Sequence, residues 1–205
     1  MVKAFINDFA ENTYIINKNK DAFVIDPGSN FKELEEYIKT KELNINGILL
    51  THGHFDHIVS LNDFVETYKC KVYIHEKERD FLFDPNLNLS GTTYQKMVVK
   101  NKEFVETFDE TFKLKLGYDN ITVLHTPGHT RGSVCYKYKG YLFSGDTLFK
   151  GTVGRTDLPT SSKGDLHQSL KKIVSKCSDN TIIYPGHGHF STLLNEKYEN
   201  PFLNN

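Results

Sequence analysis

Histidine and aspartate residues gather in one short segment of the chain, directly after a predicted buried strand. The segment Thr51-His52-Gly53-His54-Phe55-Asp56-His57 carries three imidazoles and one carboxylate. Neighbouring side chains of a helix point apart, so these groups can converge only in a tight loop, for which Gly53 supplies a permissive backbone. Imidazole and carboxylate donors without thiolates suit Zn, Fe or Mn. The segment therefore predicts a metal site.

Three further donors follow predicted strands elsewhere in the chain, and all adjoin glycine-containing turns. They are His129 after Thr126-Pro127-Gly128, Asp146 after Gly145, and His187 after Pro185-Gly186. A catalytic zinc site usually has three protein ligands and an open position. A lone histidine is more often a hydrogen-bonded structural residue, but H-x-H-x-D-H after an apolar strand is far more specific. The surplus of donors predicts a centre of two metals.

The predicted centre has a definite chemistry. Two cations about 3.5–4 Å apart need a bridging anion, which a carboxylate and a shared hydroxide can supply. A bound metal lowers the pKa of water from about 15.7 towards about 7, so a nucleophile exists at neutral pH. Such a hydroxide attacks a carbonyl carbon while a metal stabilises the oxyanion. The predicted reaction is hydrolysis without a serine or cysteine nucleophile.

Strands and helices alternate along the first half of the chain and place the histidine segment at a strand end. Asn30 and Glu33 form a capping box at the start of a predicted helix. The predicted elements are a strand at 23–25, a helix at 30–41, a strand at 47–50, a helical stripe at 58–68 and a strand at 72–74.

The second half of the chain repeats this logic. Strands are predicted at 121–124, 133–138, 141–144 and 181–184, with a helix capped by Asp165 and Gln168 before the last of them. A strand followed by aspartate occurs at Asp26 and again at Asp146, and a Gly/His loop comes later in each half. This pattern predicts two related α/β halves whose loops carry the donors, because ligands in α/β sheets bind at strand ends.

Composition narrows the class of protein. The chain has 205 residues, 38% hydrophobic and 25% charged, with a formal net charge of -1. We expect one domain over residues 1–205. The sequence does not indicate the oligomeric state. The near-neutral charge argues against nucleic acid or an anionic membrane as a partner. No apolar run reaches the roughly 20 residues of a membrane span, and the N-terminus lacks a signal-peptide pattern, which predicts a cytoplasmic protein.

Other reactive residues receive structural interpretations. Cys70, Cys135 and Cys177 lie among apolar neighbours without C-x-x-C spacing, so we expect buried packing residues. Four more histidines are expected to bind no metal: His75, His125, His167 and His189. Arg155 is interpreted as either a substrate anchor or a buried structural residue, and residues 87–100 have weak periodicity that gives them no assignment.

The motifs together resemble the metallo-β-lactamase superfamily, and within it the compact bacterial glyoxalase II-like (hydroxyacylglutathione hydrolase-like) branch. The matching pieces are Asp26-Pro27-Gly28, the Thr51–His57 segment, Thr126-Pro127-Gly128-His129-Thr130, Ser144-Gly145-Asp146-Thr147-Leu148-Phe149, Gly154-Arg155 and Pro185-Gly186-His187-Gly188. They span almost the whole chain. The resemblance implies an α/β fold of the αββα sandwich type, with two mixed sheets flanked by helices.

The resemblance also implies a role for each donor. It assigns His52, His54 and His129 to the first metal, Asp56, His57 and His187 to the second, and Asp146 to a bridging position. Asp26 matches a position that steadies the histidine loop. His52, His54 and Asp56 are the expected catalytic residues. Two divalent metals are expected, with zinc preferred and iron or manganese as alternatives.

Hydrolysis of a small-molecule thioester such as S-D-lactoylglutathione is the function that the resemblance implies. Larger glyoxalase II proteins carry a basic C-terminal helical region that holds glutathione, whereas this chain has only the short tail 193–205 after His187. The alternatives are a persulfide dioxygenase with one iron and a superfamily nuclease, which the charge disfavours. A β-lactamase is disfavoured because residue 146 is aspartate rather than cysteine. A non-enzymatic module is disfavoured because all seven donors are present.

Overall fold

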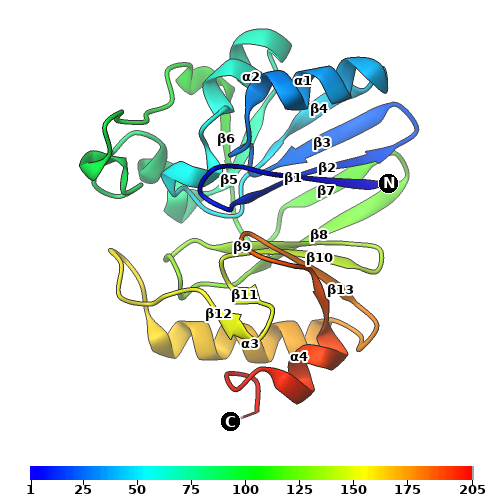
Figure 1. Cartoon of the computed structure of the whole chain (residues 1–205), viewed down its shortest axis with the longest axis vertical. Helices are drawn as coiled ribbons and strands as arrows, with labels where there is room; N and C mark the ends of the chain where they lie inside the picture. The colour runs from blue at the N-terminus through cyan, green and yellow to red at the C-terminus, as the bar shows by residue number, and fades with distance from the viewer. Residues whose placement is uncertain (205) are drawn as a thin grey trace. The chain divides into compact units, whose positions relative to one another are not determined.

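The computed structural model describes residues 1–204 (Figure 1). The chain divides into two compact units, one comprising residues 1–109 and 116–118 and the other comprising 110–115 and the residues from 119 onward. Each of the two large sheets has six strands and contains both parallel and antiparallel neighbours. The predicted two mixed sheets with accompanying helices are therefore present.

The first sheet is antiparallel at one end and parallel at the other. Strands β1 to β3 pair antiparallel, and β3 to β6 pair parallel. In sheet order the strands are β1 (Val2–Ile6), β2 (Asn12–Lys18), β3 (Asp21–Ile25), β4 (Asn44–Leu49), β5 (Val72–His75) and β6 (Val105–Phe108). The carboxyl ends of parallel β3 and β4 lie at one sheet edge, which brings Asp26 and the histidine segment together.

Helices α1 (Phe31–Thr40) and α2 (Leu61–Tyr68) accompany the first sheet (Figure 1). The predicted N-cap of α1 is confirmed, because the Asn30 side chain accepts a hydrogen bond from Lys32 N at 3.0 Å. Leu34 and Ile38 enter the core of this unit, as their spacing predicts. Burial of the apolar helix faces fixes both helices against the strands that carry the site.

The second sheet is ordered β14 (Ser191–Thr192), β13 (Ile182–Pro185), β10 (Tyr141–Gly145), β9 (Val134–Tyr138), β8 (Asp119–His125) and β7 (Lys113–Leu116). The β9–β10 hairpin is where the sequence predicts it. Strands β10 and β13 are parallel, and Gly145 pairs with Pro185 at their carboxyl ends. This pairing places the turn before Asp146 beside the turn before His187.

Helix α3 (Lys163–Lys176) supplies the apolar face of the second core, with Leu166, Leu170 and Ile173. Its predicted cap is wrong. Ser162 is the N-cap and accepts from Asp165 N at 3.2 Å, so the helix begins earlier than the sequence suggests. Serine is a strong N-cap residue, but the Asp165-x-x-Gln168 pattern also resembles a capping box and predicted the cap three residues too late. Helix α4 (Leu193–Glu199) and the β11 (Leu148–Phe149)–β12 (Thr152–Val153) ribbon complete this unit.

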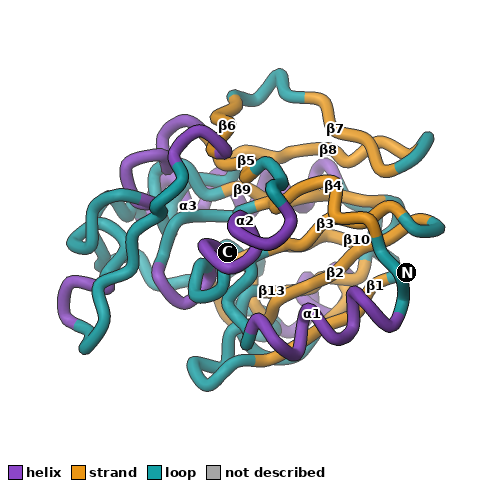
Figure 2. The backbone as a smooth tube through the Cα atoms, turned by 90° about the horizontal axis from the view of Figure 1, so that it is seen from above, coloured by secondary structure: helices purple, strands orange, loops and turns teal. Residues whose placement is uncertain are grey.

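Several elements lack a clear sequence signal. Strands β1 and β2 went unpredicted because β1 keeps three of its five residues exposed and β2 has polar ends. The long connection between β5 and β6 contains only the short 3₁₀ turns η2 (Glu76–Leu82), η3 (Ser90–Thr92) and η4 (Lys102–Phe104), and is otherwise loop (Figure 2). The weak periodicity of residues 87–100 reflects this.

The three cysteines are buried, as predicted. Burial raises the pKa of Cys135 to about 12 and that of Cys70 to about 11, so both thiols stay protonated near neutral pH. Within residues 1–204, no helix combines the length and apolar character that crossing a membrane requires.

Candidate metal centre

The first set of donors sits in the loop that leaves β4. His52, His54 and His57 are all buried, and the His52 ring centroid lies 4.7 Å from that of His54 and 4.2 Å from that of His57. Asp56 lies in the short turn η1 (Phe55–His57), with one carboxylate oxygen 3.9 Å from His57 Nε2. The loop therefore brings together all four side chains that the sequence singles out in this segment.

Asp26 organises these imidazoles from the end of β3. Its Oδ1 accepts from Thr51 N at 2.7 Å, and its Oδ2 accepts from Thr51 Oγ1 at 2.6 Å. Asp26 Oδ2 also lies 3.1 Å from His57 Nδ1. A carboxylate accepts only, so His57 Nδ1 carries the proton in this contact. His57 Nε2 is then a lone-pair donor, the form in which imidazole binds metals.

Thr51 also fixes which nitrogen carries the proton in a second imidazole, that of His52. Its hydroxyl proton is donated to Asp26, and His52 Nδ1 lies 3.1 Å from the same Thr51 Oγ1. A hydroxyl has one proton, so His52 Nδ1–H donates to Thr51 and His52 Nε2 becomes a lone-pair donor. One aspartate thus sets the tautomer of two histidines, which fits the expected role of Asp26 and suits a metal at the Nε2 atoms.

Two buried carboxylates missed by the sequence analysis also support this loop. Glu78 Oε2 accepts from Gly53 N at 3.0 Å, and Glu11 Oε1 lies 3.9 Å from His57 Nδ1. Both glutamates are fully buried. Burying an ionised carboxylate is costly unless positive charge or hydrogen bonds compensate. Glu11 and Glu78 belong to no recognisable spacing, so only their burial beside the loop identifies them.

Close backbone packing explains the Asp26-Pro27-Gly28 motif. A Cβ on Gly28 would lie 2.0 Å from Asp56 O and 2.2 Å from Glu11 Oε2. Asn7 Nδ2 donates to both Gly28 O at 2.9 Å and Asp56 O at 3.2 Å. Only glycine permits this approach. The motif thus fixes the backbone that carries Asp56.

The second set of donors gathers around the Asp146 carboxylate. Asp146 Oδ2 lies 3.4 Å from His129 Nε2 and 3.7 Å from His187 Nε2. Both separations exceed ordinary hydrogen bonds. Two imidazole Nε2 atoms therefore lie near the same carboxylate oxygen.

The loop that carries His129 is held by the segment after β12. His129 Nδ1 lies 3.0 Å from Arg155 O, a carbonyl that only accepts, so His129 also presents Nε2 as a lone pair. A Cβ on Gly154 would lie 1.8 Å from Asp146 O and 3.1 Å from His129 Nδ1. Gly154 is thus required for close contact with two predicted donors.

The remaining predicted residues take distinct places. His187 is partly buried, whereas His189 is exposed. The interpretation of Arg155 as a buried structural residue is wrong, because its side chain is exposed and forms two hydrogen bonds with Asp157, at 2.7 and 2.8 Å. His75 and His125 are buried and have structural contacts: His75 Nδ1 accepts from Lys77 N, and His125 Nδ1 lies 2.9 Å from Glu110.

Several relatives match nearly the full chain. A probable metallo-hydrolase of Streptococcus pyogenes is 38% identical, with 97% of this chain and 88% of the relative covered. Hydroxyacylglutathione hydrolase GloC of Haemophilus influenzae is 32% identical, with 97% of this chain and 95% of the relative covered.

Two solved structures are similar in both fold and sequence. The BLEG-1 B3 metallo-beta-lactamase has a TM-score of 0.92 and 35% identity, and all of both chains is covered. TTHA1623 in a di-iron-bound form has a TM-score of 0.85 and 33% identity, with 99% of this chain and 100% of the other covered. These matches confirm the predicted metallo-β-lactamase fold.

The sequence pattern of the metallo-beta-lactamase superfamily matches residues 6–187, from the first strand to the last predicted donor. His and Asp candidates for metal binding, together with the relatives named as hydrolases, support metal-dependent hydrolysis as the general activity. The chain belongs to the metallo-beta-lactamase superfamily.

Proposed function

We propose that this protein hydrolyses thioesters of the hydroxyacylglutathione type with two divalent metals. The observation that carries the proposal is the set of hydrogen bonds that leaves Nε2 of His52, His57 and His129 as lone-pair donors. The thioester class rests on the similarity to GloC along nearly the full chain.

The proposed ligands are those of the sequence analysis: His52, His54 and His129 for one metal, Asp56, His57 and His187 for the other, and Asp146 shared. Bound metals would lower the pKa of a water molecule and polarise the substrate carbonyl. Zinc remains the preferred metal, and the di-iron form of a 33%-identical relative makes iron the main alternative.

The chain's own residues have separate tasks in this proposal. Asp26 and Thr51 fix the Nδ1–H side of two imidazoles and leave Nε2 for a metal, and Glu78 holds the Gly53 backbone between the paired histidines. The Asp56 carboxylate is 17% exposed, and we propose that one of its oxygens accepts a proton from water during hydrolysis. The proposed substrate is a small-molecule thioester.

Thiol recognition is proposed to be loose. Tight binding of an anionic tripeptide requires several directed cationic donors. Arg155, the residue that the sequence analysis offers as a substrate anchor, already binds Asp157 through both guanidinium hydrogen bonds. We therefore expect turnover of several acyl thioesters with a high KM and little preference for the thiol half.

A direct assay tests the proposal. Purified protein with a measured metal content is assayed for loss of thioester absorbance with S-D-lactoylglutathione, before and after chelator treatment and after restoration of zinc or iron. Activity that is lost with the metal and regained on restoration is expected. Oxygen uptake with glutathione persulfide and no thioester cleavage would instead establish the dioxygenase alternative.

Amide hydrolysis is a second candidate because one similar structure is described as a B3 metallo-beta-lactamase. The same metal-assisted attack on a carbonyl serves a thioester and a β-lactam. A chromogenic cephalosporin assayed on the same preparation separates the two. A kcat/KM for the cephalosporin above that for every thioester tested would overturn the thioester assignment.

A further inference from the structure

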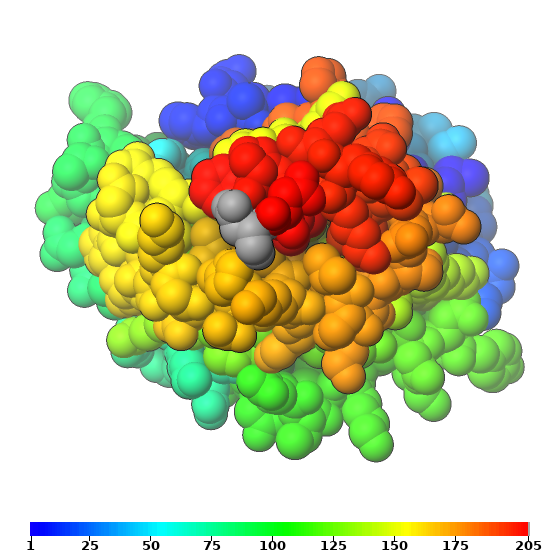
Figure 3. All heavy atoms as spheres, turned by 90° about the horizontal axis from the view of Figure 1, so that it is seen from below, coloured from blue at the N-terminus to red at the C-terminus, as the bar shows by residue number. Residues whose placement is uncertain are grey.

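A groove outside the donor clusters runs between α3 and the segment after α4, within the second unit. It consists of two adjoining cavities of about 290 and 190 Å³ that share His167, Leu170 and Phe202 as lining residues. Figure 3 shows the red C-terminal segment beside the yellow and orange segment that contains α3. Sites for small molecules usually have volumes from about 300 Å³ upward, so the two cavities together are of useful size.

The groove has an apolar floor. Val153 and Leu166 line the first cavity, and Val174 and Leu203 line the second. Phe202 stands between them and is 44% exposed. An aromatic ring with a hollow on each side leaves apolar surface that a ligand can cover.

Phe202 is held in place by its neighbour. Its backbone N donates to Asn200 Oδ1 at 3.1 Å, and Asn200 is fully buried. Asn200 Nδ2 donates to Thr152 O at 3.0 Å and to Glu196 Oε2 at 2.9 Å. These bonds anchor the turn that carries Phe202, so the two hollows belong to a defined surface.

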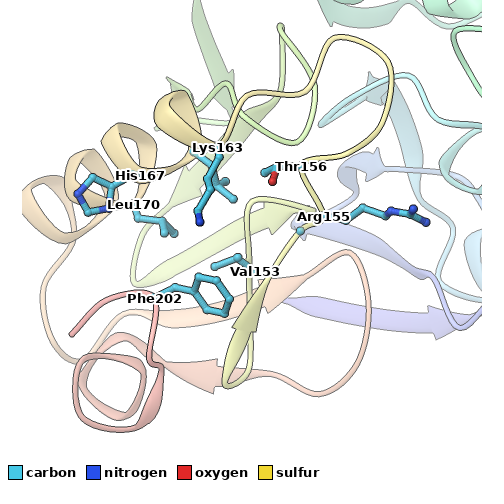
Figure 4. Close-up of a pocket in the computed structure, with 9 residues that line it drawn as sticks. Val153, Arg155, Thr156, Lys163, His167, Leu170 and Phe202 are labelled. Carbon is cyan, nitrogen blue, oxygen red and sulfur yellow. The ribbon is translucent and has the colours of Figure 1, made fainter. Parts of the chain in front are cut away.

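Two lysines and a histidine line the groove along one side of α3. Lys163, His167 and Lys171 are spaced by four residues, which places them on the same side of the helix. Across residues 1–204 none of these three side chains has an ion pair or hydrogen bond. Figure 4 shows the Lys163 side chain directed toward the space beside Leu170, Val153 and Phe202, whereas Arg155 points away. Lys163 is therefore available to an anionic ligand.

We propose that this groove binds an alkyl carboxylate, a single apolar chain that ends in one carboxylate. The carboxylate pairs with the Lys163 ammonium, and the chain lies along Leu170 and Phe202 toward the second cavity. Cationic groups above a narrow apolar floor complement this ligand in both charge and shape. The inference does not depend on the proposed hydrolase activity.

The groove adjoins the segment that supports a predicted metal ligand. Gly154 and Arg155 line the first cavity, and Arg155 O is the acceptor for His129 Nδ1. A bound chain would contact this segment from the side opposite to the exposed Arg155 guanidinium, which Figure 4 shows directed away from the cavity. Binding at the groove is nevertheless independent of metal, since no lining residue is a predicted ligand.

The absence of tryptophan from the chain permits a specific optical test. Phe202→Trp introduces a single indole into the groove, and Tyr118→Trp, at a 95% exposed position in the other unit, is the control. Titration with dodecanoate is expected to change the emission of the Phe202→Trp protein only. Each fully buried methylene contributes about a fourfold gain in affinity, so burial of two of the four extra methylenes of dodecanoate already makes it bind at least tenfold tighter than octanoate.

Charge variants test the carboxylate contact by calorimetry on the otherwise unchanged protein. Lys163→Gln should weaken dodecanoate binding at least fivefold, and Lys176→Gln on the same helix, which lines neither cavity, should leave it unchanged. Dodecyltrimethylammonium should bind at least tenfold more weakly than dodecanoate. Circular dichroism and metal content establish that each variant is folded.

The outcomes are decisive for the groove and separable from the metal chemistry. Equal binding of dodecanoate before and after chelation supports the proposal even if no thioester is hydrolysed. The proposal is overturned by absence of binding, by equal affinity for the cationic amphiphile, or by loss of binding when metal is removed.

Discussion

Asp26 Oδ2 lies 3.1 Å from His57 Nδ1 and simultaneously accepts the hydroxyl proton of Thr51. Through Thr51 the same carboxylate also determines which nitrogen of His52 carries a proton. The Asp26 carboxylate thus sets the proton positions of two predicted metal ligands, although it is expected to bind no metal itself.

Asp26→Asn should lower metal affinity about 10- to 100-fold, the usual effect of losing a hydrogen-bond partner of a metal-bound histidine. The amide has one acceptor oxygen and cannot serve the Thr51 amide, the Thr51 hydroxyl and His57 together. Competition with a chromophoric chelator measures the affinity. Asp63→Asn, at an exposed position of α2, is the matched control, and equal affinities of the two variants would refute the role of Asp26.

Gly154→Ala should disturb Asp146 and His129 together, because the added Cβ would lie 1.8 Å from the Asp146 carbonyl oxygen. We expect lower metal content and a lower Tm. Gly140→Ala in the β9–β10 turn is the control, since nothing lies within 4 Å of its Cβ position. Its stability should change by less than about 0.5 kcal/mol. Differential scanning calorimetry and elemental analysis provide the comparison, and a normal metal content in Gly154→Ala would contradict the expectation.

His187→Ala should reduce activity at least tenfold more than His189→Ala. His187 Nε2 lies 3.7 Å from Asp146 Oδ2, whereas the His189 side chain is exposed. Steady-state kinetics with a thioester and metal analysis of both variants measure the difference. Equal losses, or a larger loss for His189→Ala, would show that the assignment is wrong.

Asp146→Ala should lower occupancy by both metals, because the proposed role of Asp146 is that of a shared ligand. Elemental analysis of protein reconstituted with excess zinc is the measurement. Asp157→Ala, which removes only the exposed partner of Arg155, should retain full loading. Two metals per chain in Asp146→Ala protein would exclude the bridging role.

The pKa of Cys135 predicts a pH dependence of stability. Burial raises this pKa from 9.0 in the unfolded chain to about 12, so folding favours the protonated thiol. The contribution of the protonated Cys135 thiol to the free energy of unfolding is fully present below pH 9. It is lost as pH rises from 9 towards 12, because the unfolded state releases the proton first. Denaturant titrations at several pH values should show a smaller alkaline loss of unfolding free energy for Cys135→Ala than for the native protein.

A cysteine-free variant with Ala or Val at all three positions should be less stable, because cavities replace the buried thiols, and should still retain metal.

The sequence by itself supplied the candidate residues for the chemistry and the position of most elements. His52, His54, Asp56 and His57 are adjacent along the chain, so their convergence in a loop follows from local geometry. The apolar spacing of α1 and its Asn30 cap are likewise local signals, and both are confirmed. Glycine-containing turns identified three further donors, because each of these donors directly follows a strand.

Tertiary structure decided which residues support that chemistry. Glu11 and Glu78 reach the histidine loop from remote segments, and neither has a sequence motif. The tautomers of His52 and His57 depend on Asp26, which is brought beside Thr51 by parallel strand pairing. The hollows beside Phe202 also depend on packing between distant segments. Local spacing predicts elements and donors, whereas burial and hydrogen bonds between distant residues arise only when the chain is folded.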